Sequence, residues 1–394
     1  MQQRPNRYDY LFTWEQEGFK AKEATHRRSV TVQGDQVGAY QEFLHVPEKL
    51  KRDFARMRAA NDLYAQIAVG FYVPLILGAV VLIIIWIRRK DLDWRSLVLI
   101  STAVGGLMML NEWNQLPFFI DQTSTSTPYY ETLAIGLLRG LCYGVFVFLY
   151  VILAAAAGEP LYRRAQPGEL SLASGFAWRG LRSKRAFNAC VVGYAFAAVH
   201  IAFVVAFYLI GRKFGVWSPQ EIEYSDLLST LLPWIYPVAI SLLAATSEEF
   251  WFRLFAVPAL QRIVKWRWVA IVVAAFVWGF LHSNYPQQPG YIRGIEVGII
   301  GVAAGFLMMR YGILSTLIWH FTVDAVLIGM FLFQSESGYF QLSGLVVVAA
   351  ILMPLAISLI SYRRNRGFVT TPEALNEGVR LADAPAETVV EPVL

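Results

Sequence analysis

Two adjacent carboxylates and an arginine lie at the end of a long apolar run, in the stretch 246–253 that reads TSEEFWFR. An ionisable side chain within a membrane span costs about 2.5–3.5 kcal/mol on insertion scales, so such a residue usually serves a function. Side chains four residues apart share one face of a helix, and Glu249 and Arg253 are therefore predicted to form an ion pair. Glu248 points about 100° away around the helix axis and stays free for chemistry. The simpler interpretation is a structural ion pair at a helix end.

Two later apolar stretches each combine a histidine with a partner four residues away. Trp278 precedes His282, so its indole is predicted to pack over the histidine's face of the helix. Asp324 follows His320 at the spacing that lets a carboxylate meet or orient an imidazole. A solitary intramembrane histidine is most simply a packing residue bonded to a backbone carbonyl, which is our interpretation of His200. Successive helices with such residues instead predict one shared polar site inside a bundle.

The carboxylates, imidazoles and arginine of these stretches supply a general base, polarising groups and oxyanion donors. A covalent nucleophile is not indicated, because no serine lies in a G-x-S-x-G setting and Cys142 and Cys190 are remote from the motifs in sequence. In a water-poor pocket two adjacent carboxylates do not both ionise cheaply unless a cation holds one of them charged. Arg253 can do this for Glu249, which leaves Glu248 as the candidate general base for a water molecule.

Two other uses of these residues stay open at this stage. Imidazole and carboxylate suit zinc, so Glu248, His282 and His320 are candidate ligands of a divalent metal, although the H-E-x-x-H spacing is absent. A non-catalytic protein, either a proton-coupled carrier or an immunity or scaffold protein, can also bury Glu, His and Asp side chains. The lack of a clear internal repeat argues against the carrier.

The composition indicates what kind of molecule positions these residues. Of 394 residues, 56% are hydrophobic and 16% are charged, and the mean hydropathy is +0.45. These values predict an all-α polytopic membrane protein that contacts lipid. The formal net charge of +5 is expected from cytoplasmic loops, so it predicts no nucleic-acid partner. The two cysteines lie in apolar runs and predict no disulfide framework.

Apolar stretches long enough to cross a bilayer core, about 20 residues each, predict about eight to nine transmembrane helices. The sixth and seventh of nine stretches are short, which favours helices buried inside the bundle. In chain order the stretches are 64–87, 96–113, 132–156, 187–211, 226–250, 268–283, 294–309, 313–333 and 340–361.

The N-terminal segment has a different pattern. Alternating β-branched and aromatic residues predict two or three strands at Tyr8–Trp14, Ser29–Val32 and Val37–Leu44, with a turn at Gly34. A sheet this small is marginal alone, so we expect the end of a larger extramembrane domain. A basic amphipathic helix over Glu48–Ala60 is expected to lead into the first span.

The distribution of Lys and Arg predicts the orientation. Basic clusters mark every second connection, which places the C-terminus on the cytoplasmic side of an inner or plasma membrane. The same alternation puts the basic N-terminal segment outside, as is acceptable for a long or folded segment. The alternative is that 96–113 is re-entrant, which would change only the N-terminal side. The predicted regions are an extramembrane segment 1–60, N-terminal membrane helices 61–225, a catalytic-type membrane core 226–362 and a disordered cytoplasmic tail 363–394.

The three motifs together resemble those of the CPBP family of intramembrane proteases, which includes the CAAX prenyl endopeptidases and bacterial Abi-type proteins. The family's marks are E-E-x-x-x-R, F-x-x-x-H and H-x-x-x-N or D on successive membrane helices. Here they read as Glu248-Glu249-x-x-x-Arg253, Trp278-x-x-x-His282 and His320-x-x-x-Asp324. The resemblance covers residues 226–333. Residues 1–60 also resemble the end of an extracytoplasmic domain that precedes this core in some bacterial members.

The resemblance implies an intramembrane endopeptidase that acts on membrane-associated proteins or peptides, lipidated or not. It implies that Glu248 activates the hydrolytic water with help from His282, and that Glu249 and Arg253 support the site. The family has been treated both as metalloproteases and as glutamate-dependent proteases, so the resemblance leaves the metal question open.

His320 and Asp324 are implied to stabilise the oxyanion that forms at the scissile carbonyl. Asp324 replaces the Asn of the prenyl endopeptidases, and an ionised carboxylate only accepts hydrogen bonds. Asp324 is therefore expected to orient His320 instead. Trp278 stands where the family has Phe, and it keeps an aromatic packing role beside the substrate pocket.

Overall fold

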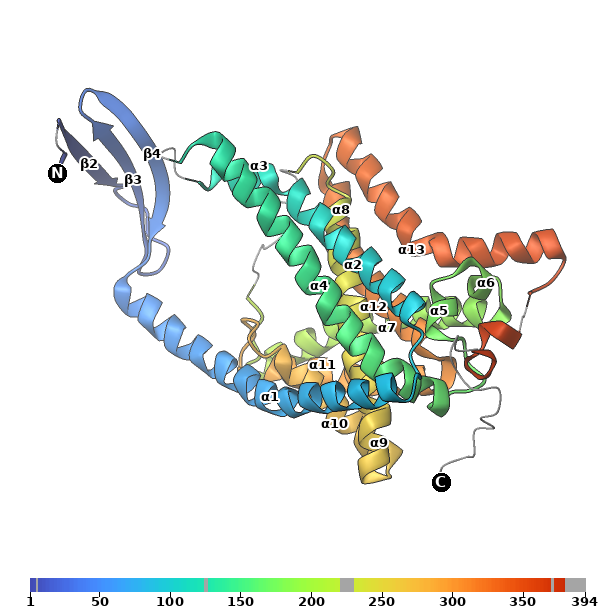
Figure 1. Ribbon diagram of the computed structural model, residues 1–394. Helices are drawn as coiled ribbons and strands as arrows, with labels where there is room; N and C mark the ends of the chain where they lie inside the picture. The colour runs from blue at the N-terminus through green and yellow to red at the C-terminus, as the bar shows by residue number, and fades with distance from the viewer. Residues whose placement is uncertain (5, 124–126, 220–229, 370–371, 380–394) are drawn as a thin grey trace. The chain divides into compact units, whose positions relative to one another are not determined.

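The computed structural model describes residues 1–4, 6–123, 127–219, 230–369 and 372–379, and Figure 1 shows the course of the chain. The chain divides into two compact units, Met1–Leu63 and Tyr64–Leu394. The candidate site residues all belong to the second unit, in which the described elements are helices.

The first unit begins with a four-stranded antiparallel meander in the order β1-β2-β3-β4. A two-residue turn joins the last two strands, and Gly34, at φ +66°, takes the left-handed conformation that such a turn requires. The predicted meander and its turn are confirmed, with one additional short strand. The strands are β1 (Gln2–Arg4), β2 (Arg7–Glu15), β3 (Thr25–Gln33) and β4 (Gln36–His45).

Helix α1, Glu48–Arg88, unites the predicted amphipathic helix and the first predicted span in one element. The sequence changes from basic to apolar within this helix, which suggested two elements. Residues 60–64, where the change occurs, contain neither Gly nor Pro, so nothing there interrupts the backbone hydrogen bonds.

Within the described residues, seven helices are long and apolar enough to cross a membrane. The fifth and sixth predicted spans are present as the shorter helices α8 (Ile235–Glu249) and α10 (Arg267–Leu281), and residues 226–229 lie outside the described residues. The predicted helical polytopic fold with a small N-terminal β segment is confirmed. Besides α1, the long helices are α2 (Trp94–Asn114), α4 (Tyr129–Ala165), α7 (Lys184–Gly211), α11 (Ile292–Tyr311), α12 (Ile313–Gly329) and α13 (Gly338–Asn365); short helices are α3 (Leu116–Asp121), α5 (Leu172–Gly175) and α6 (Trp178–Leu181).

Helices α2 and α4 lie side by side (Figure 1), and small residues set how closely α4 approaches its neighbours. A Cβ atom added to Gly105 of α2 would lie 2.6 Å from the Gly144 carbonyl oxygen. Further along α4, a Cβ atom on Gly158 would lie 2.9 Å from the backbone of Leu254. Close backbone packing of this kind drives helix association in membranes. Because Leu254 follows Arg253 in the chain, the second contact supports the segment that carries the candidate site.

Helix α11 approaches α10 through glycines on both helices. A Cβ atom at Gly279 would lie 2.5 Å from the Gly294 carbonyl oxygen, and one at Gly301 would lie 2.9 Å from the Trp278 ring. The two helices therefore interlock at the turn that carries Trp278 and, four residues later, His282.

Part of the predicted disordered tail has a defined structure. Residues 372–379 form two short 3-10 turns, and Ala374 is buried. Asn376 Nδ2 donates a hydrogen bond to the Gln166 carbonyl oxygen at 2.7 Å. These contacts with the connection after α4 order a stretch whose composition indicated disorder. Composition could not predict the contacts, because the residues that make them are remote in sequence. Residues 380–394 lie outside the described residues.

Replacing Gly158 by Ala tests the close contact between α4 and the site segment. We expect Gly158→Ala to lower the melting temperature of the detergent-solubilised protein, because overpacking costs about 1–3 kcal/mol. The control is Gly106→Ala on α2, where an added Cβ atom meets nothing within 4 Å. Equal melting temperatures for the two variants would contradict the proposed contact.

Candidate active site

Glu248 and Glu249 lie inside a longer helical path, and not at a helix end as the sequence indicated. Helix α8 continues directly into a π-helical segment, η3 (Phe250–Ala256), and then into α9 (Val257–Val264). Every residue of the π-helical segment is buried, including Arg253. The charge of Arg253 suggested that the membrane-spanning helix ends here, but the ion pair of Arg253 allows this residue to be buried. Such π-helical segments are frequent at functional sites.

Glu249 is completely buried and binds two partners through the same oxygen atom. Its Oε1 accepts a hydrogen bond from Arg253 Nη1 at 3.0 Å, so the predicted ion pair is present. The same Oε1 lies 2.9 Å from Nδ1 of His320 on α12. A carboxylate only accepts hydrogen bonds, so Nδ1 of His320 carries the hydrogen and its Nε2 faces the rest of the site.

The guanidinium of Arg253 lies against two indole rings. Its Cζ atom is 4.0 Å from the ring centroid of Trp278 and 5.9 Å from that of Trp319. Cation–π contacts are worth about 2 kcal/mol when desolvated. Trp278 also packs on His282 as predicted, with ring centroids 5.2 Å apart. The sequence did not point to Trp319 as a site residue. The one feature that could have indicated it is its position directly before His320.

Glu248 occupies a more open position than its neighbour. Its side chain is 28% exposed, whereas that of Glu249 is fully buried. Oε2 of Glu248 accepts a hydrogen bond from Trp278 Nε1 at 2.5 Å, and it lies 3.6 Å from Nε2 of His282 and 3.9 Å from Nε2 of His320. The two imidazole distances exceed those of direct hydrogen bonds and are of a size that a water molecule can bridge. The pair of glutamates is thus divided into a buried member and an open one.

His282 follows the last residue of α10 and is oriented by that helix. Its Nδ1 lies 2.9 Å from the Trp278 carbonyl oxygen. A carbonyl oxygen only accepts hydrogen bonds, so Nδ1 carries the hydrogen and Nε2 presents a lone pair toward Glu248.

Asp324 lies beside His320 but does not orient the ring through a direct hydrogen bond. Its Oδ2 is 3.6 Å from Nε2 of His320, whereas Glu249 Oε1 holds the opposite nitrogen at 2.9 Å. The orienting contact expected from Asp324 is therefore made by Glu249. The reason is tertiary, because the packing of α8 on α12 brings together two residues that no local spacing relates.

Three further residues surround the site. His200 accepts a hydrogen bond from Trp319 Nε1 at 3.3 Å, so it is a packing residue whose partner is an indole and not the expected backbone carbonyl.

The hydroxyls of Tyr72 on α1 and Tyr150 on α4 are 2.9 Å apart, and Tyr72 packs edge-on against Trp251. The tyrosines gave no sequence signal because helices remote in the chain bring them together.

The three candidate metal ligands, Glu248, His282 and His320, converge on one region. However, the Trp278 N–H bonds to the Glu248 oxygen that faces both imidazoles. In the part of the chain that the structure describes, no group of three or more His, Cys, Asp or Glu side chains is arranged to hold a metal ion. These described residues thus form no preformed metal site in this conformation.

Comparison with known proteins connects this geometry to a family. Residues 230–326 match the family model described as type II CAAX prenyl endopeptidase Rce1-like. The matched range contains all seven candidate residues of the three motifs. The resemblance inferred from those motifs is therefore confirmed for this part of the chain.

One curated relative is the sporulation-killing factor biosynthesis protein SkfC of Bacillus subtilis (strain 168). It is 22% identical over 200 residues, which cover 51% of this chain and 38% of the relative. The chain therefore spans well under half of that relative's length. No solved structure matches the chain.

We expect Glu249→Gln to destabilise the protein more than Glu248→Gln. Loss of the Glu249 charge leaves Arg253 buried without its counter-ion, and breaking a buried pair typically costs about 3–5 kcal/mol. Glu248 is partly exposed and contacts an indole N–H, so its replacement should lower the stability of the protein less. Melting temperatures of both variants and the parent protein in one detergent provide the comparison. An equal decrease for the two variants would argue against separate roles.

Proposed function

We propose that this chain is an intramembrane endopeptidase that hydrolyses peptide bonds of membrane-associated proteins or peptides. The observation that carries the proposal is the convergence of Glu248 Oε2 with Nε2 of both His282 and His320, at 3.6 Å and 3.9 Å. The family match over residues 230–326 supports the reaction class.

Glu248 acts as the general base in this proposal. A water molecule between Glu248 and His282 donates one hydrogen to the carboxylate and the other to the lone pair on Nε2. Glu248 takes the proton as the water oxygen attacks the scissile carbonyl carbon. The proton then passes to the leaving amine as the carbon–nitrogen bond breaks, which restores the ionised carboxylate.

His320 stabilises the oxyanion in this proposal. In its protonated form it donates from Nδ1 to Glu249 and from Nε2 toward the carbonyl oxygen, where negative charge develops. Asp324, 3.6 Å from Nε2, favours the positive charge of the ring. Arg253 binds the same Glu249 oxygen that holds His320, and it therefore acts on the reaction through His320.

The substrate is proposed to be a peptide or protein held at the membrane. The motif-bearing helices belong to a bundle whose long apolar helices can cross a bilayer, which supports a substrate that is itself held at the membrane. Substrates with and without lipidation both belong to the proposed class.

We also propose that the C-terminus lies in the cytoplasm and the N-terminal sheet lies outside, from the alternation of basic clusters. A cysteine-free background with Cys142→Ala and Cys190→Ala allows single cysteines to report the side. We expect Asp35→Cys to react with a membrane-impermeant maleimide on intact cells, and Arg364→Cys to react only after lysis. The reverse pattern would overturn the orientation.

Activity is tested with purified protein in liposomes and a panel of membrane-anchored peptides, with and without lipid anchors. We expect Glu248→Gln and His282→Ala to reduce the cleavage rate by about 10²–10⁴-fold, the range for loss of general acid–base catalysis. Mass spectrometry of the products measures both the rate and the bond cleaved.

The matched control is Glu112→Gln, which removes a carboxylate paired with Arg139 on another face of the bundle. It should retain the parent cleavage rate. Undiminished cleavage by Glu248→Gln would refute the mechanism. Proton flux that depends on Glu248, with no peptide cleaved, would favour the non-catalytic carrier instead.

A further inference from the structure

A large pocket lies apart from the candidate active site. It is formed by the adjoining ends of α1 and α2, the short helices α5 and α6, and residues 373–379. Its volume is about 990 Å³, at the upper end of the range of about 300–1,000 Å³ for small-molecule sites. No residue of the three motifs lines it, so the proposed peptidase chemistry does not account for it.

Three residues of the pocket lining are basic. Lys90, Arg95 and Arg179 are exposed, and none of the three forms an ion pair with another described residue. Two acidic residues also line the pocket. Asp93 accepts a hydrogen bond from the backbone at the start of α2 and so serves as the cap of that helix, and Glu373 is exposed. The lining therefore carries an excess of positive charge.

Four other residues of the lining are apolar and exposed. Leu99 is 61% exposed, Ile87 49%, Trp94 45% and Phe176 41%. Ile87 and Trp94 lie at the ends of helices long enough to cross a membrane, which is the level of the lipid headgroups. Tryptophan is enriched at that level. A ligand that satisfies both the basic and the apolar lining residues combines an anionic group with an apolar tail.

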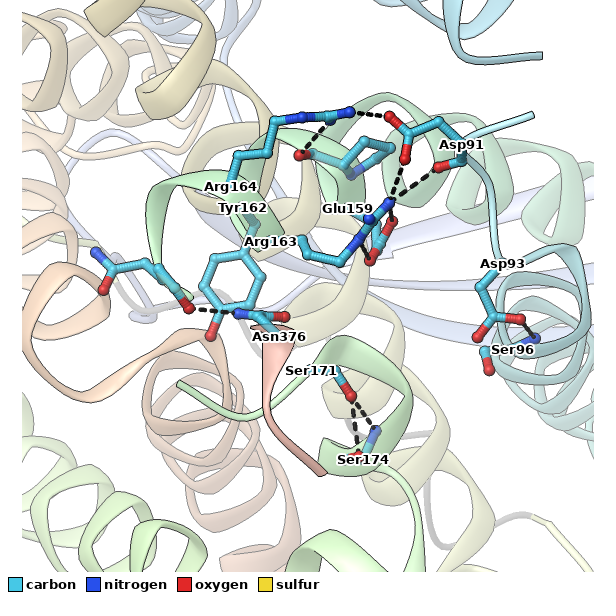
Figure 2. A network of polar contacts seen from close by, with 12 residues as sticks. Asp91, Asp93, Ser96, Glu159, Tyr162, Arg163, Arg164, Ser171, Ser174 and Asn376 are labelled. Atoms are coloured by element: carbon cyan, nitrogen blue, oxygen red, sulfur yellow. Dashed lines mark hydrogen bonds and ion pairs between the residues drawn. The ribbon is translucent and has the colours of Figure 1, made fainter. Parts of the chain in front are cut away.

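A cluster of ion pairs holds the connection between α1 and α2 that forms one wall of the pocket (Figure 2). Arg163, near the end of α4, donates to Asp91 at 2.7 Å and to Glu159 at 2.9 Å. Arg164 pairs with the other oxygen of Asp91, and its Cζ lies 4.8 Å from the ring centroid of Trp86, which lines the pocket. Two arginines balance two carboxylates, so the cluster fixes the wall without cancelling the positive charge of the lining.

We propose that this pocket binds a phospholipid with an anionic headgroup. Lys90, Arg95 and Arg179 hold the phosphate, and the acyl chains leave along Ile87 and Leu99. Basic pockets between the ends of membrane helices have the chemistry that recognises such headgroups. A soluble phosphate ester offers the same charge but makes no use of the apolar side. The proposal is independent of the peptidase function.

The test uses the full chain in detergent, with dioleoylphosphatidylglycerol and dioleoylphosphatidylcholine as ligands and native mass spectrometry as the measurement. We expect the parent protein to bind phosphatidylglycerol more tightly than phosphatidylcholine. The triple variant Lys90→Gln, Arg95→Gln, Arg179→Gln should weaken phosphatidylglycerol binding by about tenfold or more, because each basic group contributes to headgroup attraction. Glycerol 3-phosphate should not displace the lipid at equal concentration.

The matched control is Lys265→Gln, Arg267→Gln, Arg364→Gln, which removes the same charge at the ends of other helices and should leave phosphatidylglycerol binding unchanged. Ala173→Trp fills the pocket without changing charge and should also abolish the preference for phosphatidylglycerol, which separates loss of the site from misfolding of the triple variant. Equal losses in the pocket and control triples would overturn the proposal. Retained preference in Ala173→Trp, or displacement by glycerol 3-phosphate, would also overturn it.

Discussion

The positive charge of Arg253 must be neutralised within an apolar helix bundle, and most of the site's geometry follows from this requirement. An uncompensated buried charge is too costly to retain, so Glu249 is drawn into the interior one helical turn away. The Oε1 atom that neutralises Arg253 also binds His320 on another helix. Trp278 covers the guanidinium and donates to Glu248 from the same ring. Packing, charge balance and ring orientation are thus coupled.

The two polar clusters of the bundle differ in how far their charges are balanced. Near the end of α4, Asp91 and Glu159 face Arg163 and Arg164, so each carboxylate has a guanidinium partner. The candidate active site has three carboxylates and one arginine, and its remaining partners are imidazoles and an indole. Imidazoles can gain and lose protons near neutral pH, whereas arginine cannot. The first cluster is suited to fixing the connection between α1 and α2, and the second is suited to transferring a proton.

Such a site also needs a bundle in which the helices cannot slide. Lipid tails are as apolar as the side chains, so burial of apolar surface contributes little to association between membrane helices. Close backbone contacts replace it, as where Gly158 meets Leu254 and Gly279 meets Gly294. Each contact adjoins a site element, the π-helical segment in one case and the turn carrying Trp278 in the other. The glycines therefore contribute to the distances between the candidate site residues.

The sequence by itself determined what depends on local geometry and composition. Membrane character, the N-terminal meander and the pairing of Glu249 with Arg253 all follow from spacing or from summed hydropathy. Only the tertiary structure decided that Glu249, and not Asp324, holds the ring of His320, and that Trp319 lies against Arg253. Helical spacing relates residues on one helix, whereas these contacts depend on how α8 and α12 pack. The same limit explains why the continuation of α8 beyond its charged residues could not be read from hydropathy, since burial of a charge depends on partners that other helices supply.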